Sequence, residues 1–146
     1  MERNFASVTI TDKGVRFLRA GHSWVYADEV TGVKGLYEPG DIVDVYSGRG
    51  RWLGAGFVND RSKIRVRIVS KNPNDRFDGA FWRRRVRWAL DYRKAVMGEE
   101  YAACRLIFGE ADGFPGLTVD RYNGVLVTEV LSAGMERVKE LLYDIL

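Results

Sequence analysis

The chain has 146 residues, of which 46% are hydrophobic and 29% are charged, a balance typical of globular proteins with a buried core. No apolar run reaches the ~18 residues that a membrane-spanning helix needs, and the first ten residues lack the apolar core of a secretory signal. A single cysteine, Cys104, excludes an internal disulfide framework and a cysteine-based metal cluster. We therefore expect a cytoplasmic protein with no membrane partner.

The net charge of +3 is unevenly distributed along the chain. Residues 1–72 contain 12 Lys/Arg and 8 Asp/Glu, residues 73–98 contain 7 and 3, and residues 99–146 contain 4 and 9. The first two thirds of the chain is therefore basic, which favours a polyanionic partner. A basic surface that is only solvated explains the same composition.

Short strands and turns are predicted from the N-terminus onwards. Residues 4–10 alternate as in a strand, and residues 12–22 predict a short helix that Gly21 ends. A Pro-Gly turn precedes a second alternating strand, and residues 48–52 predict the tip of a hairpin whose returning strand covers residues 52–59.

Residues 63–70 alternate strictly between charged and apolar side chains. Ile64, Val66 and Ile68 share one face of the predicted strand, and Lys63, Arg65 and Arg67 share the other. The repeated strands and turns predict a small β-barrel or sandwich over residues 1–70.

Residues 71–76 are rich in helix breakers and predict a linker. A long helix is predicted from residue 77, capped by Asp75 or Asp78 and ended by Gly98. Its apolar residues form two adjacent stripes that together cover more than half of the helix: Phe77, Phe81, Trp88, Tyr92 and Ala95 in one, and Trp82, Val86, Ala89, Leu90 and Met97 in the other. We expect this helix to be packed on two sides, with a narrow basic face in solvent.

Three strands and a helix are predicted to complete a second domain over residues 77–146. The strands fall at residues 104–110, 116–122 and 124–132, and residues 135–146 form an amphipathic helix. The predicted fold class is α+β, with a small barrel followed by a helix, three strands and a helix.

The catalytic and metal-binding chemistry of common enzyme sites is sparse in this sequence. The chain has one histidine, His22, and one cysteine, too few for a zinc site or for most nucleophile–base pairs. Glu110 and Asp112 form a weak candidate carboxylate pair, because the surrounding Asp-Gly and Pro-Gly dipeptides are typical of turns. We expect these carboxylates to accept backbone N–H groups or to pair with an arginine such as Arg105 or Arg121. We predict no catalytic residue and no metal ligand.

Residues 104–134, CRLIFGEADGFPGLTVDRYNGVLVTEVLSAG, resemble the pattern R-L-I-x-G-E-x-D-G-x-P-G-L-x-V-D-R-Y. That pattern characterises the SAM-dependent 23S ribosomal RNA methyltransferases of the cytosine-5 class, which begin with a PUA domain. Residues 17–30, 38–59 and 62–70 resemble that PUA domain in the same order. The chain departs from the family pattern at two positions. Cys104 replaces a more frequent tyrosine, and Ser23 replaces the proline of the typical run His-Pro-Trp-Val.

The resemblance implies that the chain corresponds to the PUA domain and the central α+β domain of such an enzyme. The family's S-adenosylmethionine-binding domain carries a catalytic cysteine and an Asp-Pro-Pro loop, whereas the three prolines of this chain are Pro39, Pro73 and Pro115. We therefore expect no cofactor and no catalysis in this chain alone, with S-adenosylmethionine bound by the full-length parent. The Gly109–Tyr122 segment is then a packing and spacing device.

The resemblance also implies an RNA-binding surface on the first domain. Arg16, Arg19 and His22 of the first helix would flank a groove together with Lys63, Arg65 and Arg67. Arg49 and Arg51 on the hairpin tip are further phosphate-binding candidates, and Arg83, Arg84 and Arg87 either extend the basic surface or pair with the acidic final third. Trp24 is assigned to the core in preference to base stacking, and Trp52, Trp82 and Trp88 are assigned to packing.

The sequence thus predicts the RNA-binding N-terminal region of a SAM-dependent ribosomal RNA (cytosine-5) methyltransferase, with ribosomal RNA as its partner. Two alternatives stay open: a free-standing PUA-type RNA-binding protein, and a protein-interaction module that forms a homodimer or docks a partner.

Overall fold

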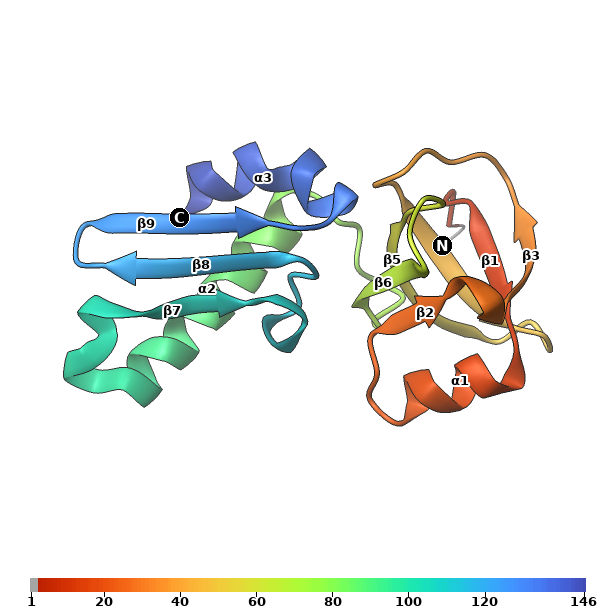
Figure 1. The fold of residues 1–146 in the computed structure, drawn as a ribbon, viewed down its shortest axis with the longest axis horizontal. Coiled ribbons are helices and arrows are strands. Elements are labelled where there is room, and N and C mark those ends of the chain that lie inside the picture. The colour runs from red at the N-terminus through yellow and green to blue at the C-terminus, as the bar shows by residue number, and fades with distance from the viewer. Residues whose placement is uncertain (1–2) are drawn as a thin grey trace. The chain divides into compact units, whose positions relative to one another are not determined.

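The fold is described by a computed structural model, which covers residues 3–146 (Figure 1). The chain divides into two compact units, Met1–Pro73 and Asn74–Leu146, called here the first and second units. The division falls inside residues 71–76, the segment with the linker composition.

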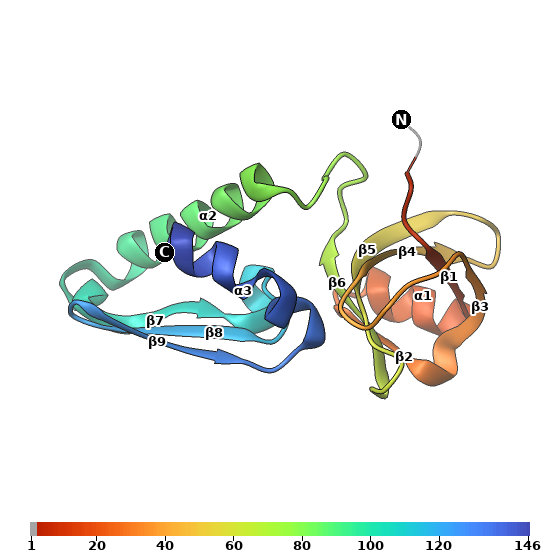
Figure 2. The ribbon, with the colours of Figure 1, turned by 90° about the horizontal axis from the view of Figure 1, so that it is seen from above.

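The first unit is a six-stranded curled sheet with one helix (Figures 1 and 2). The strand order is β2-β6-β5-β4-β1-β3, in which β1 and β4 are parallel and the other neighbours are antiparallel. Its elements are β1 (Ser7–Ile10), α1 (Asp12–Arg19), β2 (Trp24–Tyr26), the 3-10 turn η1 (Ala27–Glu29), β3 (Val30–Lys34), β4 (Ile42–Ser47), β5 (Trp52–Val58) and β6 (Ile64–Ser70). The predicted strands, the short helix and the hairpin are confirmed.

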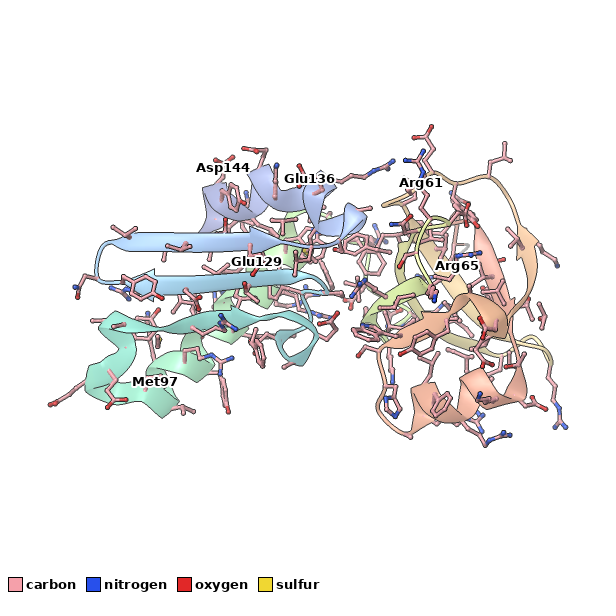
Figure 3. All side chains as sticks on the ribbon, in the orientation of Figure 1. Arg61, Arg65, Met97, Glu129, Glu136 and Asp144 are labelled. Atoms are coloured by element: carbon pink, nitrogen blue, oxygen red, sulfur yellow. The ribbon has the colours of Figure 1, made fainter. Side chains whose placement is uncertain are left out.

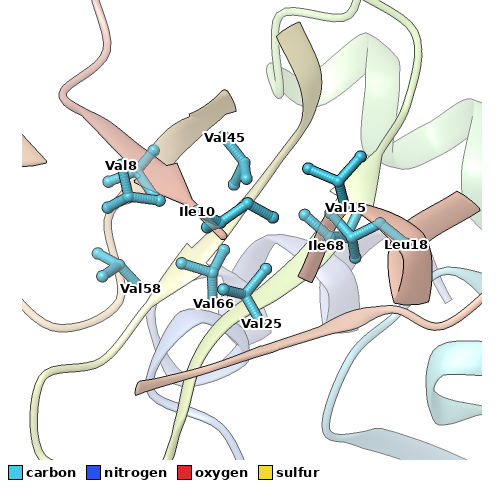
Figure 4. Packing of buried hydrophobic residues seen from close by; sticks show 10 residues of the cluster. Val8, Ile10, Val15, Leu18, Val25, Val45, Val58, Val66 and Ile68 are labelled. Atoms are coloured by element: carbon cyan, nitrogen blue, oxygen red, sulfur yellow. The ribbon is translucent and has the colours of Figure 1, made fainter. Parts of the chain in front are cut away.

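The core of the first unit lies between the curled sheet and α1 (Figure 4). It contains Val8, Ile10, Val15, Leu18, Val25, Val43, Val45, Val58, Val66 and Ile68. Burial of each such side chain stabilises the fold by roughly 1.5–3 kcal/mol. Because Val66 and Ile68 point into this core, Arg65 and Arg67, which alternate with them, are directed to the opposite face of β6, as the alternation predicts.

The second unit packs two helices on one face of a three-stranded antiparallel sheet of order β7-β8-β9 (Figure 2). Its elements are α2 (Gly79–Met97), the 3-10 turn η2 (Gly98–Ala102), β7 (Ala103–Phe108), the 3-10 turn η3 (Gly109–Asp112), β8 (Leu117–Tyr122), β9 (Val125–Val130) and α3 (Ala133–Ile145). The predicted order of helix, three strands and helix is confirmed, so the α+β fold class holds for the whole described chain.

Helix α2 departs from its predicted packing. Asp78 is its N-cap and accepts a hydrogen bond from the backbone N–H of Phe81, and Gly98 ends it with a φ of +53°. In the second predicted stripe Trp82, Val86 and Ala89 are buried, whereas the first stripe is buried only at its start, at Phe81. Trp88 and Tyr92 are 59% and 55% exposed. The predictions that this helix is packed on two sides and that Trp88 is a packing residue are therefore wrong.

No helix within residues 3–146 combines the length and apolar character needed to span a membrane.

Candidate RNA-binding surface

Helix α1 presents its basic residues to solvent because Val15 and Leu18 direct its opposite face into the core. Thr11 caps the helix by accepting a hydrogen bond from the backbone N–H of Gly14, and Val15 and Leu18 are buried. Arg16 and Arg19 are exposed in the last turn, where positive charge interacts favourably with the negative end of the helix dipole. A phosphate can therefore reach both guanidinium groups.

His22 follows α1 and is also exposed. Its imidazole ring meets the ring of Phe17 edge to face, with 5.4 Å between the centroids. The backbone N–H of His22 donates to the carbonyl of Phe17 at 3.1 Å. These contacts hold the imidazole beside the C-terminal end of α1, close in the chain to Arg19.

Two hydrogen bonds link β6 and the residue that follows it to the C-terminal turn of α1 and to the segment after that helix. The Lys71 ammonium donates to the carbonyl oxygen of Leu18 at 2.6 Å, and the backbone N–H of Ile68 donates to the carbonyl of Ser23 at 2.7 Å. The basic end of α1 and the basic face of β6 are thus parts of one corner of the first unit, as the resemblance implies. Sequence reasoning did not assign Lys71 to this corner, although it directly follows the alternating strand.

Arg67 lies over the ring of Trp24, with 5.2 Å between the guanidinium carbon and the ring centroid. The two residues are direct partners in the antiparallel pairing of β2 and β6. Trp24 is half-buried and does not belong to the core cluster, so its predicted core assignment is wrong. The planar guanidinium group and the indole ring form a cation–π contact, which stabilises the fold by roughly 0.5–1 kcal/mol at exposed sites.

The other two candidates on this strand are arranged differently. Lys63 is exposed at the start of β6. Arg65 is half-buried, and its guanidinium lies 3.6 Å from the carboxylate of Asp60 (Figure 3). The hydroxyl of Tyr37 also donates to Asp60, at 2.8 Å. Partial burial, followed by this hydrogen bond and the Asp60 charge, raises the pKa of Tyr37. Because Asp60 neutralises part of its charge, Arg65 offers less net attraction to a phosphate than Arg16 or Arg19 does.

Arg49 and Arg51 are exposed at the tip of the β4–β5 hairpin. The tip lies beyond the paired parts of β5 and β6, which end at Ala55 and Ser70. These two arginines therefore belong to a separate basic projection of the first unit.

The second unit contains the remaining arginine candidates. Arg83 and Arg87 are exposed on α2. The Arg84 guanidinium donates to the Asp75 carboxylate at 2.9 Å. A different arginine of α2, Arg93, pairs with the acidic final third of the chain: it donates to the Asp112 carboxylate at 2.7 Å. The carboxylate that pairs with Arg84 therefore precedes the helix and does not belong to the acidic final third.

The glycine-rich turn of the second unit has clear structural roles. Asp112 accepts from the backbone N–H of Phe108 at 2.7 Å as well as from Arg93, so Arg93 takes the place predicted for Arg105 or Arg121. Arg105 instead binds both carboxylate oxygens of Asp120, at 2.8 and 3.1 Å. This hydrogen bonding lowers the pKa of Asp120. These carboxylates fix the turn and the sheet.

Acidic side chains are exposed elsewhere in the second unit, on β9 and α3. They include Glu129, Glu136 and Asp144 (Figure 3). No group of three or more His, Cys, Asp or Glu side chains within residues 3–146 is arranged to hold a metal ion.

The first unit matches a known family model, described as a PUA-like domain, over residues 8–71. The fold of these residues is thus PUA-like. This assignment fits the curled sheet, its single helix and the position of α1 at one end of the core.

Curated relatives match nearly the whole chain. Ribosomal RNA large subunit methyltransferase I of Alteromonas mediterranea is 38% identical over 136 residues, which are 92% of this chain and 34% of that protein. The protein of the same name from Shewanella amazonensis is 40% identical over 126 residues, which are 86% of this chain and 32% of the relative. The chain is homologous to part of these proteins and spans about a third of their length.

Two solved structures share the fold. A SAM-dependent methyltransferase from Streptococcus mutans aligns with a TM-score of 0.79 and 16% identity, over 95% of this chain and 36% of that one. A methyltransferase solved in complex with SAH aligns with the same TM-score, identity and coverage. At this identity the comparison establishes a shared fold.

Proposed function

We propose that this chain is the RNA-binding N-terminal region of a ribosomal RNA methyltransferase, which acts in the cytoplasm on large-subunit ribosomal RNA. The observation that carries the proposal is a PUA-like domain whose first helix and β2–β6 pair bear exposed or stacked cations at one corner. The homology to ribosomal RNA large subunit methyltransferase I supports ribosomal RNA as the ligand.

The corner formed by Arg16, Arg19, His22 and Arg67 suits a folded RNA better than a single small anion. Its charges come from two elements, so they can contact successive phosphates on a nucleic acid backbone. Such contacts give affinity and orientation, while sequence recognition requires base edges or RNA shape.

The proposal also includes the reaction of the complete enzyme, methyl transfer. By the resemblance, the complete enzyme would methylate cytosine C5 with S-adenosylmethionine as the methyl donor. A dinucleotide-binding loop places the phosphates of its ligand at the N-terminus of a helix that follows a strand. In this chain β1 leads into α1, but the Thr11 hydroxyl at the start of α1 donates to the Glu29 carboxylate. A carboxylate at this position does not suit the phosphates of such a ligand. We place the cofactor site outside these residues. Saturating S-adenosylmethionine should leave the melting temperature of the chain unchanged, whereas a bound ligand at 100 times its Kd would add about 2.7 kcal/mol of stability.

The test is RNA affinity as a function of salt. The 146-residue chain is titrated into fragments of 23S ribosomal RNA at several salt concentrations, and log K is plotted against log salt. The slope for single-stranded or duplex RNA contacts should be about 0.7–0.9 per phosphate neutralised. The double variant Arg16→Ala/Arg19→Ala should lose roughly two contacts from that slope. Lys34→Ala, an exposed lysine on β3, is the matched control from the same unit.

The alternatives predict different results. If the double variant and Lys34→Ala have the same slope as the wild type, this corner is not the RNA site. If the chain binds no RNA but associates with protein independently of salt, it is an interaction module. A free-standing RNA-binding protein would show the same binding, with no methyltransferase domain encoded after Leu146.

A further inference from the structure

Two large aromatic side chains stand exposed on α2. Trp88 and Tyr92 are 59% and 55% exposed, and residues four apart on a helix lie on the same side with about 5–6 Å between their Cβ atoms. Large adjacent aromatic residues on a surface mark binding sites more often than isolated apolar ones do. Their sequence pattern resembles that of a core stripe, yet neither is covered within the described chain.

The two rings line an open pocket of about 420 Å³. Arg85, from the same helix, and Glu110, Asp112 and Gly113, from the loop after β7, also line it. This volume lies within the range of about 300–1,000 Å³ that is common for small-ligand sites.

The walls of this pocket are held in place before any ligand binds. The Arg85 guanidinium donates to the carbonyl oxygen of Gly113 at 3.1 Å, and Arg93 donates to Asp112 at 2.7 Å. Both bonds connect α2 to the loop that follows β7. A ligand therefore meets a largely preformed site, which reduces the ordering cost of binding.

Cations surround the two rings. The guanidinium carbon of Arg84 is 5.5 Å from the Trp88 ring centroid, and that of Arg93 is 5.1 Å from the Tyr92 ring centroid. Arg87, the residue before Trp88, is exposed. Because Arg84 and Arg93 are paired with Asp75 and Asp112, part of their charge is neutralised, and the exposed Arg87 is the candidate contact for a negatively charged ligand. Aromatic faces beside such a cation suit a ligand that combines flat rings with negative charge, which is the chemistry of single-stranded nucleic acid.

We propose that this pocket binds an unpaired nucleobase of single-stranded RNA, stacked on Trp88 beside Tyr92, while Arg87 contacts a flanking phosphate. The inference rests on the proposed RNA-binding function and adds a second contact of a different kind. The corner of the first unit holds phosphates, whereas this pocket holds the face of a base. A duplex keeps its bases stacked on one another, so the pocket selects single strands.

The experiment measures binding of a fluorescein-labelled, mixed-sequence, single-stranded RNA decamer to the 146-residue chain by fluorescence anisotropy. Stacking of one base contributes an amount equivalent to roughly 5- to 150-fold in affinity. Trp88→Ala should therefore weaken binding at least fivefold, and Tyr92→Ala should weaken it by a smaller factor. Trp88→Phe should keep most of the affinity, because a ring face remains. The salt dependence of binding should stay the same in all three variants, because no phosphate contact is removed.

Tyr122→Ala is the matched control. Tyr122 is an aromatic residue of the same unit, on β8, and is 57% exposed, so its loss removes a similar exposed ring outside the pocket. If Trp88→Ala and Tyr122→Ala change the affinity equally, the inference is wrong. It is also wrong if Trp88→Ala instead abolishes self-association of the chain in sedimentation, because the rings would then form a protein interface.

The two proposals fail separately. A chain that binds folded 23S fragments through the α1 corner but does not bind the decamer would overturn the base-stacking site and leave the proposed function standing. A chain that binds neither RNA would overturn both. Because Trp88 and Tyr92 are more than half exposed, their substitution should leave the melting temperature nearly unchanged, and this is checked for each variant.

Discussion

Arg67 and Trp24 lie directly opposite each other on β6 and β2, with the guanidinium 5.2 Å from the centre of the indole ring. The arginine lies over the ring and remains half-buried on β6, the strand next to the edge strand β2. It has two separable properties, a planar surface that packs on Trp24 and a charge that attracts phosphate. Substitutions that remove one property or both distinguish between them.

Arg67→Ala should weaken the binding of 23S ribosomal RNA fragments and reduce the salt slope by about one contact, because it removes the charge. It should lower the free energy of unfolding by roughly 0.5–1 kcal/mol, because the cation–ring contact is also lost. Arg67→Lys keeps the charge and should retain the wild-type slope. Equal slopes for Arg67→Ala and the wild type would show that this arginine is structural only.

Asp44 forms the most deeply buried ion pair of the first unit's described residues. It is 1% exposed, accepts from Nε of Arg3 at 2.8 Å, and accepts from Nε1 of Trp52 at 2.8 Å. Asp44→Ala leaves the Arg3 charge and the Trp52 N–H without this partner, so we expect a loss of about 3 kcal/mol in the free energy of unfolding.

Urea denaturation measures this loss. Asp28→Ala is the control, because Asp28 is an exposed carboxylate of the same unit, and it should change stability by less than ~0.5 kcal/mol. A similar small effect for both variants would mean that the buried pair contributes little beyond its desolvation cost.

Local patterns in the sequence were sufficient for most of the fold. Alternation over residues 63–70 predicted β6 and its buried Val66 and Ile68, because side chains on a strand point to opposite faces in turn. The end of α2 was predicted from Gly98, and its N-cap was one of two candidates, Asp75 and Asp78, because capping depends on residues within one helical turn. These signals act over a few residues and are therefore visible without a tertiary structure.

Long-range partners could not be predicted in the same way. Arg93 binds Asp112 19 residues away, and Arg85 binds the carbonyl of Gly113 28 residues away. Sequence spacing does not specify which elements pack together. The exposure of Trp88 has the same origin, because a helical wheel gives the direction of a side chain but not how far a sheet extends beneath it. The candidate pocket was missed for this reason, although the sequence did contain its aromatic pair.

Gly113 is required at its position for two reasons. Its φ is +78°, and a Cβ built there would lie 1.9 Å from Nη1 of Arg85. Gly113→Val should therefore lower the free energy of unfolding by more than about 1–3 kcal/mol, because the left-handed backbone conformation is costly for a β-branched residue and Arg85 is displaced as well. Thermal and urea denaturation of the variant measure the loss.

Gly124→Val is the control for that substitution. A Cβ at Gly124 meets no atom within 4 Å, and this glycine has no positive φ. Comparable losses for the two variants would indicate that valine is unfavourable in both turns for a reason unrelated to Arg85. A smaller loss at Gly113 than at Gly124 would contradict the structural account.

Asp120→Asn tests whether the carboxylate of the glycine-rich segment is structural. The Arg105 hydrogen bond lowers the pKa of Asp120 in the folded state, so the ionised carboxylate stabilises the fold above the ordinary aspartate pKa of about 4. That contribution is lost as the pH falls through the lowered folded-state pKa. Since the Arg105 side chain is 45% exposed, solvent screens the pair and its contribution to stability at pH 7 should be small.

Urea unfolding at pH 7 and pH 3 should therefore show a stability difference between wild type and Asp120→Asn that shrinks at the lower pH. Glu129→Gln is the control on the same sheet, because Glu129 is an exposed carboxylate opposite Thr118. The affinity of Asp120→Asn for 23S ribosomal RNA fragments should equal that of the wild type, because the α1 corner and the Trp88 pocket are both intact. A folded Asp120→Asn protein with reduced RNA affinity would instead place this carboxylate in the RNA-binding machinery.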